Sequence, residues 1–132
     1  MAGLVAIVVA HDSAEALPDC LAALAAEHVP AIVVDNASRD GSAALAERAG
    51  AQVVRNPRNE GYGRANNIGV RAAIRASRVL ILNPDVILRP GAADALLFAA
   101  AAYPEAGLLA PRLVEPDGRV FFQPRSLLAP YL

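Results

Sequence analysis

Short runs of apolar, mostly β-branched residues alternate along the chain with longer alanine-rich stretches. The short runs have the length and composition of strands, and the longer stretches have those of helices. The first run, Leu4–Ala10, is apolar at every position and predicts a central parallel strand buried on both faces. Strands and helices that alternate with short connections predict an α/β protein with a doubly wound, mostly parallel sheet and helices on both faces.

The expected elements fill residues 1–132 as a single domain. Strands are expected at Leu4–Ala10, Ala31–Asp35, Gln52–Arg55 and Val79–Leu82. Helices are expected over Ala14–Ala26 with Asp12 or Ser13 as N-cap, and through Arg48 with Asp40 as the cap. A polar, glycine-rich segment, Asn56–Gly63, is expected to lead into a helix that ends near Ala76, and a further helix is expected from Pro90 to about Tyr103. The remainder, Gly107–Leu132, is expected to hold at least one strand and a turn at Pro116–Gly118.

Charge and hydropathy narrow the range of partners. The net charge is -1, so the composition does not indicate binding to nucleic acid. The longest later apolar run, Ala95–Tyr103, is far shorter than the ~20 residues that span a bilayer. We therefore expect a cytoplasmic protein with no transmembrane segment. Peripheral binding at the inner face of the membrane is compatible with this expectation. The single cysteine, Cys20, is expected to be a buried thiol.

Polar residues follow every expected strand. These segments are Ala10–Ser13, Asp35–Ser38, Asn56–Gly61 and Asn83–Asp85. Because ligands of open α/β sheets bind at the carboxyl ends of the strands, the pattern predicts a polar cleft there. Caps and turns are the alternative explanation. The first strand has no glycine-rich turn after it and no Walker A sequence is present, which argues against a dinucleotide-binding dehydrogenase and a P-loop ATPase.

Four segments resemble motifs of glycosyltransferase family 2, in the family's order. Val8–Ser13 resembles its opening strand, with Ala10, His11 and Asp12 as departures, and Val33–Ser42 is close to its second-strand signature. Asn59–Asn67 follows its Gly, Ala and Asn spacing, and Leu82–Val86 stands where the family has its DxD motif. The resemblance covers roughly residues 4–120 and is nearest to the rhamnosyltransferase-type members.

The resemblance implies a GT-A fold and a role for each matching residue. Asp35 would accept a hydrogen bond from the imide N–H of uracil or thymine in a UDP- or dTDP-type sugar nucleotide. Asp85, the one carboxylate left in the DxD position, would bind Mg²⁺ or Mn²⁺ together with the phosphates. The other residues placed at the nucleotide sugar are Ala10, His11, Asp12, Asn36, Arg64, Asn67 and Asn83.

No catalytic residue is assigned. In this family an acidic base acts on the acceptor hydroxyl, and none of the acidic residues after Asp85 stands in a matching segment. We expect the chain to be the donor half of an inverting glycosyltransferase with a glycan or lipid-linked acceptor, inactive without an acceptor half. The apolar segments Val120–Phe122 and Leu127–Leu132 suggest a homodimer built after Gly107. A non-catalytic nucleotide-sugar-binding module and an α/β interaction domain are the alternatives.

Overall fold

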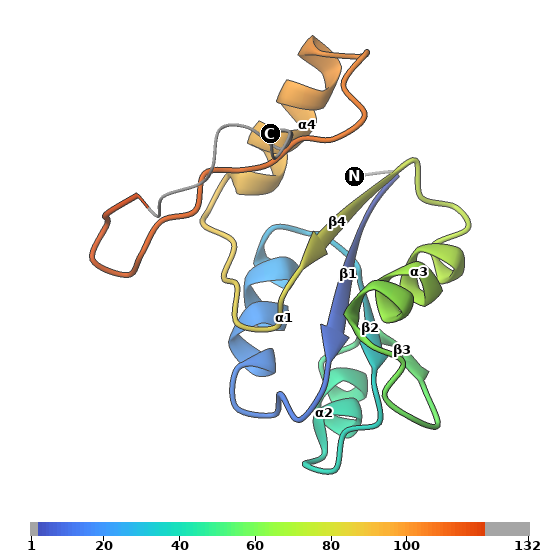
Figure 1. The fold of residues 1–132 in the computed structure, drawn as a ribbon. Coiled ribbons are helices and arrows are strands. Elements are labelled where there is room, and N and C mark those ends of the chain that lie inside the picture. The colour runs from blue at the N-terminus through green and yellow to red at the C-terminus, as the bar shows by residue number, and fades with distance from the viewer. Residues whose placement is uncertain (1–2, 121–132) are drawn as a thin grey trace, which may run out of the picture. The chain divides into compact units, whose positions relative to one another are not determined.

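A computed structural model describes residues 3–120 and contains a four-stranded sheet in the order β3-β2-β1-β4, with every neighbouring pair parallel (Figure 1). The strands are β1 (Leu4–Ala10), β2 (Ala31–Asp35), β3 (Gln52–Arg55) and β4 (Arg78–Leu82). The helices are α1 (Leu17–Ala26), α2 (Ser42–Arg48), α3 (Tyr62–Ala72) and α4 (Ala92–Ala102). The prediction of an α/β protein is confirmed.

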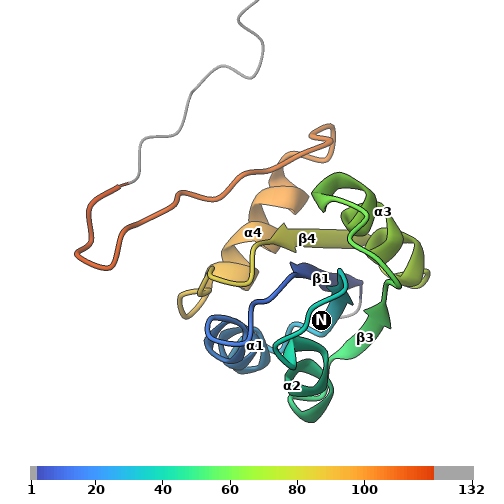
Figure 2. The ribbon, with the colours of Figure 1, turned by 60° about the horizontal axis from the view of Figure 1, so that its bottom comes forward.

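The chain winds in two directions from the central strand β1. It first adds β2 and β3 on one side of β1, and α3 then carries it back to place β4 on the other side. Figure 2 shows α1 and α2 on one face of the sheet and α3 on the opposite face. The sheet is therefore doubly wound, as the sequence predicted, and all its strands end at the same edge.

The core is concentrated around β1 and β2. The side chains of Ile7, Val8, Val33 and Val34 are fully buried, as expected for the middle strands of a sheet covered on both faces. On the α3 side the helix comes very close to the sheet at Gly69. A Cβ atom there would overlap Cγ2 of Ile7 and would lie 3.0 Å from Cγ2 of Val34. The absence of a side chain at Gly69 therefore sets the distance between α3 and the sheet.

The first helix begins later than expected. Its N-cap is Ala16, which makes no side-chain cap, so the prediction of Asp12 or Ser13 as N-cap is wrong. Asp12 adopts a left-handed conformation with φ of 48°, and the carbonyl of Ser13 accepts the N–H of Leu17 in a turn that precedes the helix. The Asp12 side chain accepts the N–H of Arg39 in the loop after β2, and the Ser13 hydroxyl donates to the carbonyl of His11, so neither side chain caps the helix.

The chain divides into two compact units, Met1–Ala93 and Asp94–Leu132. In the second, the expected turn is present, since Gly118 N–H donates to the carbonyl of Glu115. Between residues 107 and 120, the described part of the segment expected to hold a strand, β pairing is limited to one antiparallel bridge between Val114 and Val120. Phe121, Phe122 and the segment 127–132, on which the dimer prediction rests, lie outside the described residues.

Candidate functional site

The residues that follow the four strands meet along the carboxyl edge of the sheet. Ala10 and Asp35 are paired in register across β1 and β2, and Asp35 is paired with Arg55 of β3. On the other side of β1, Leu82 at the end of β4 is paired with Val8. The first unit alone therefore brings together the predicted residues of the first, second and fourth strands, and α3 starts from the same edge.

The loops after β1 and β2 are joined through Asp12. Its backbone N–H donates to Oγ of Ser38 over 3.0 Å, and its Oδ1 accepts the N–H of Arg39 over 2.7 Å. The side chain was predicted to lie at the nucleotide sugar. In the structure one of its oxygens is occupied by the neighbouring loop, so Asp12 shapes the edge by fixing the two loops to each other.

Asp40 makes a second link between the same loops. Its Oδ2 accepts the N–H of Ala14 over 2.8 Å, and its Oδ1 accepts the N–H and the hydroxyl of Ser42 over 3.1 and 2.5 Å. These hydrogen bonds, that of the Ser42 hydroxyl above all, hold the pKa of the Asp40 carboxyl below its usual range. The N-cap of α2 is Gly41, so the prediction of Asp40 as the cap is wrong, but the Asp40 carboxylate accepts the N–H of the first helical residue, Ser42, and also holds the loop after β1.

Asn36 is the centre of a buried polar network. Its Oδ1 accepts the Nδ2–H of Asn56 over 3.1 Å and the backbone N–H of Glu60 over 2.9 Å, and its Nδ2 donates to Oδ1 of Asn59 over 2.8 Å. Its backbone carbonyl lies 2.9 Å from Nδ1 of His11. The side chain predicted to bind the nucleotide thus holds the loop between β3 and α3, a role shared with residues that sequence reasoning did not single out.

Asp35 presents a buried acceptor at this edge. The residue is 5% exposed, and its Oδ1 is buried without a hydrogen-bond partner. Among the described residues, only Oδ1 of Asn66 shares this condition. Because buried polar atoms are usually paired, an unpaired carboxylate oxygen at a strand end marks a place where a ligand can donate a hydrogen bond.

Comparison with known proteins gives the family. A model of the family named Glycosyl transferase family 2 matches residues 5–131. The chain belongs to glycosyltransferase family 2. Its resemblance to that family, inferred from four motifs, is confirmed.

The family 2 chain is similar to curated mycobacterial proteins. It is 35% identical over 111 residues to the N-acetylglucosaminyl-diphospho-decaprenol L-rhamnosyltransferase of Mycobacterium tuberculosis, covering 75% of this chain and 36% of the relative. It is 54% identical over 59 residues to an uncharacterized glycosyltransferase of the same species, covering 45% of this chain and 26% of that protein. The matched part of the chain therefore spans about a third of the length of the first relative and about a quarter of the second.

Solved structures of similar shape confirm the GT-A fold. A crystal structure of S. aureus TarS superposes with a TM-score of 0.65 at 23% identity, covering 78% of this chain and 32% of the other. Glucosyl-3-phosphoglycerate synthase from Mycobacterium tuberculosis, in complex with uridine diphosphate, gives a TM-score of 0.55 at 21% identity, covering 65% and 35%.

In this family 2 chain the segment after β4 is open to solvent. The side chains of Asn83 and Asp85 are exposed, and the Sγ–H of Cys20 points to the carbonyl of Asn83 over 3.8 Å. Burial, and secondly the negative charge of Asp85, raise the pKa of the Cys20 thiol to about 11. The described residues include no cluster of three His, Cys, Asp or Glu side chains that could enclose a metal ion. Any metal held here would depend on Asp85 and on ligand oxygens.

The remaining predicted residues differ in how accessible they are. Ala10 is fully buried, and its carbonyl accepts the N–H of Asn36 over 2.7 Å, so it contributes backbone structure to the edge. Arg64 pairs with Oε2 of Glu60 over 3.2 Å, and Glu60 also pairs with Arg58. Asn67 is exposed on α3, one turn beyond Arg64. Arg64 is therefore tied to the loop that Asn36 holds.

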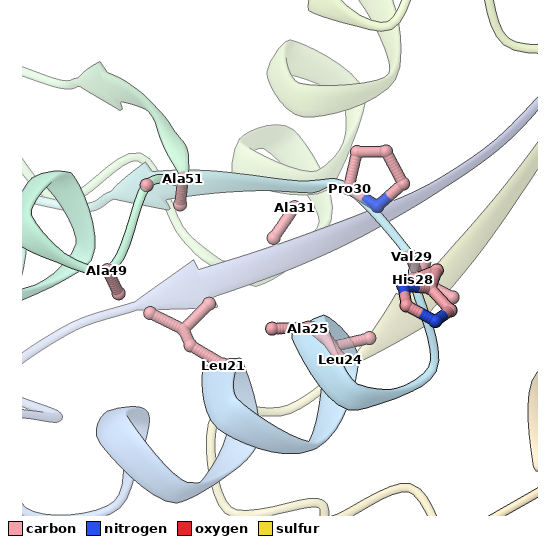
Figure 3. A pocket seen from close by; sticks show the side chains of 10 residues that line it. Leu21, Leu24, Ala25, His28, Val29, Pro30, Ala31, Ala49 and Ala51 are labelled. Atoms are coloured by element: carbon pink, nitrogen blue, oxygen red, sulfur yellow. The ribbon is translucent and has the colours of Figure 1, made fainter.

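A separate hollow of about 340 Å³ lies at the other end of the sheet, where β2 and β3 begin (Figure 3). Its lining is mostly aliphatic and comes from the end of α1 and from the residues before these strands, including Leu21, His28 and Ala51. It is distinct from the polar carboxyl edge and contains none of the predicted site residues. Within residues 3–120, no helix is long and apolar enough to cross a membrane.

Proposed function

We propose that this chain binds a nucleoside-diphosphate sugar of the UDP or dTDP type at the carboxyl edge of the sheet, as the donor-binding domain of an inverting glycosyltransferase. The observation that carries the proposal is the buried, unpaired Oδ1 of Asp35. Uracil and thymine each carry an imide N–H that can donate to this oxygen. Cytosine has no hydrogen at the equivalent ring nitrogen, so Asp35 would discriminate against CDP.

The location of Asp85 suits the diphosphate. Strands β2 and β4 flank β1, so their ends are two strand spacings apart across the sheet, about 10 Å, and are staggered by two residues along β1. A nucleotide whose base lies at Asp35 can extend across the end of β1 towards the segment after β4. The Asp85 carboxylate is exposed there, and within the described residues no side chain forms a hydrogen bond or ion pair with it.

The donor set fits a Mg²⁺ or Mn²⁺ ion that is bound together with the nucleotide. Such ions are commonly held by one or two carboxylates and by substrate phosphates, and Asp85 would be the carboxylate. When bound, the ion would neutralise charge that develops on the leaving diphosphate. The similar synthase from Mycobacterium tuberculosis has been crystallised with Mn²⁺ and uridine diphosphate, which supports the proposal.

The acceptor would be a glycan or a lipid-linked sugar, as the name of the rhamnosyltransferase relative suggests. We assign no catalytic base to this chain. Of the acidic residues after Asp85, Asp117 is paired with Arg119 in a turn. We therefore expect residues 1–132 to bind the donor without transferring the sugar.

Calorimetry with UDP, dTDP and CDP, with and without Mn²⁺, tests the proposal. Asp35→Ala should weaken binding of UDP and dTDP while leaving the effect of Mn²⁺ intact, and Asp85→Ala should abolish the effect of Mn²⁺. Glu47→Ala, which removes an exposed carboxylate paired with Arg55, is the matched control and should change neither. Equal nucleotide affinities for the parent and both variants would contradict the assignment of both residues. If none of the three nucleotides binds, the result would favour the alternative that the chain is an α/β interaction domain.

Activity of the complete gene product separates the two nucleotide-binding alternatives. A donor domain predicts sugar transfer that is lost in Asp85→Ala, whereas a non-catalytic module predicts nucleotide binding without transfer. Transfer by residues 1–132 alone, abolished by mutating an acidic residue within them, would show that a base had been missed.

A further inference from the structure

Positive charge is concentrated in one segment of the chain. Residues 58–78 contain five arginines and one glutamate, a net charge of +4, whereas the other 111 residues contain seven arginines and twelve acidic residues, a net charge of -5. The net charge of the whole chain is therefore small although the charges are distributed unevenly along the sequence. An uneven distribution of this kind can orient a protein in an external field even when its total charge is small.

The structure places much of this charge on the outer side of α3 and on the turn that follows it. Exposed Arg64, Asn67 and Arg71 recur at helical spacing, while Ala65 and Gly69 face the sheet. In Figure 2 the helix covers the sheet with one side and turns its other side outward. The outward side is therefore basic along the length of the helix.

Three of these arginines have no counter-ion in the part of the chain that the structure describes. Arg58 and Arg64 share Glu60, but no carboxylate within residues 3–120 pairs with Arg71, Arg75 or Arg78. All three are exposed. Their charge is available to an external anion.

Aliphatic side chains are interspersed among the unpaired arginines. Ile74 is 86% exposed and stands in the turn between Arg71 and Arg75, and Val70 at the end of α3 is 39% exposed. We refer to Val70, Arg71, Ile74, Arg75 and Arg78 as the α3 surface. Burying the Ile74 side chain would be favourable, so a partner that is both anionic and apolar would match this combination of side chains.

We propose that the α3 surface docks on a membrane surface that contains anionic lipids. The arginine guanidinium groups would contact the lipid headgroups while Ile74 and Val70 enter the boundary between headgroups and acyl chains. A nucleic acid would satisfy the arginines but would leave the aliphatic side chains without a favourable contact. The acidic remainder of the chain would be repelled by the membrane, which favours a single orientation with α3 towards the bilayer.

Vesicle co-sedimentation of the full chain tests this proposal. One set of vesicles contains phosphatidylcholine alone and the other contains equal parts of phosphatidylcholine and phosphatidylglycerol. Binding is expected only to the anionic vesicles and should weaken as salt is added, because exposed charges are screened within a short distance. Equal binding to both sets, or no binding to either, would overturn the proposal.

Two double variants with the same change in net charge locate the contact. Arg71→Ala with Arg75→Ala should weaken binding by about 25-fold, about fivefold for each arginine removed. Arg48→Ala with Arg89→Ala removes two exposed arginines outside the α3 surface and should change binding less than twofold. Equal losses in the two double variants would mean that only net charge matters and would overturn the assignment to α3.

Ile74→Ser separates a membrane from a nucleic acid. It should weaken binding to the anionic vesicles at every salt concentration, because it removes an apolar contact and leaves the charge unchanged. The same proteins are titrated with a single-stranded RNA oligonucleotide. RNA binding that is tighter than vesicle binding, lost in the Arg71 and Arg75 double variant and unaffected by Ile74→Ser, would assign the surface to nucleic acid and refute the membrane proposal.

Discussion

The side chain of Asn36 donates a 2.8 Å hydrogen bond from Nδ2 to Oδ1 of Asn59, which joins the end of β2 to the loop before α3. The Asn59 oxygen also accepts the N–H of Gly61, the N-cap of α3. The conformation of this loop therefore depends on an amide that is itself 2% exposed and bonded to two further groups. Asn36 positions the loop that carries Glu60.

Asn36→Ala should lower the free energy of unfolding by about 2 to 3 kcal/mol, because it leaves the buried amide of Asn56 and the N–H of Glu60 without partners. Urea denaturation gives the value. Asn36→Asp keeps the oxygen that accepts these bonds but loses the donor to Asn59, so it should fall between the parent and Asn36→Ala. Asn67→Ala, an exposed amide on α3, is the control and should change stability by less than about 0.5 kcal/mol. Equal stabilities for all the variants would refute the positioning role.

The close approach of α3 to the sheet gives a second prediction. Gly69→Ala should destabilise the protein by about 1 to 3 kcal/mol, because the added methyl group overlaps Ile7 and crowds Val34, which outweighs the gain in helix propensity. Gly63→Ala is made in the same helix, where a Cβ meets nothing within 4 Å, and should be neutral or stabilising by up to about 1 kcal/mol. Thermal unfolding of the two variants compares them directly, and a stabilising Gly69→Ala would show that α3 sits farther from the sheet.

The elements of the sheet could be predicted because each depends on local composition. The bounds of β1, β2 and β3 are those expected from the apolar runs, and β4 begins one residue earlier. The start of α1 could not be predicted, because Asp12 and Ser13 resemble an N-cap locally, but the Asp12 side chain accepts the N–H of Arg39 and the Ser13 hydroxyl donates to the carbonyl of His11. Local pattern cannot show which of two competing partners a polar side chain takes.

The location of the candidate site followed from topology, whereas the roles within it did not. Parallel strands end at one edge, so the polar residues after the strands had to meet there. The partners of Asn36 lie 20 or more residues farther along the chain, at Asn56, Asn59 and Glu60. A sequence motif identifies the asparagine but does not show whether its side chain forms hydrogen bonds with a ligand or with a loop of the protein.

The lowered pKa of Asp40 makes a prediction about acid stability. A carboxyl whose pKa is lower in the folded than in the unfolded state stabilises the fold above its unfolded pKa, and this contribution is lost as the pH falls through the folded pKa. Asp40→Asn should therefore lower the melting temperature at neutral pH, and the difference from the parent should shrink as the pH falls below the ordinary aspartate pKa of about 3.9. Melting curves across this pH range test it. A difference that stays constant with pH would mean that the Asp40 charge has no part in holding Ala14 and Ser42.

The pKa of Cys20, raised to about 11, predicts an unreactive thiol and reports on the position of Asp85. Because burial is the first cause and the charge of Asp85 the second, Asp85→Asn should lower this pKa but leave it above 9.0, the ordinary value. The ultraviolet absorbance of the thiolate, followed as a function of pH, measures the shift. Asp19→Asn removes an exposed carboxylate next to Cys20 in sequence and should leave the thiol pKa unchanged.

The same thiol links stability to alkaline pH. Since the folded state holds the proton more tightly than the unfolded state, the contribution of Cys20 to stability is complete below about pH 9 and is lost as the pH rises towards 11. Cys20→Ala should remove this alkaline loss, although it also leaves a small cavity that lowers stability at every pH. Unfolding of both proteins at neutral and alkaline pH distinguishes the two effects. If the parent and Cys20→Ala differ in stability by the same amount at neutral and at alkaline pH, the thiol ionises as readily in the folded chain as in the unfolded one.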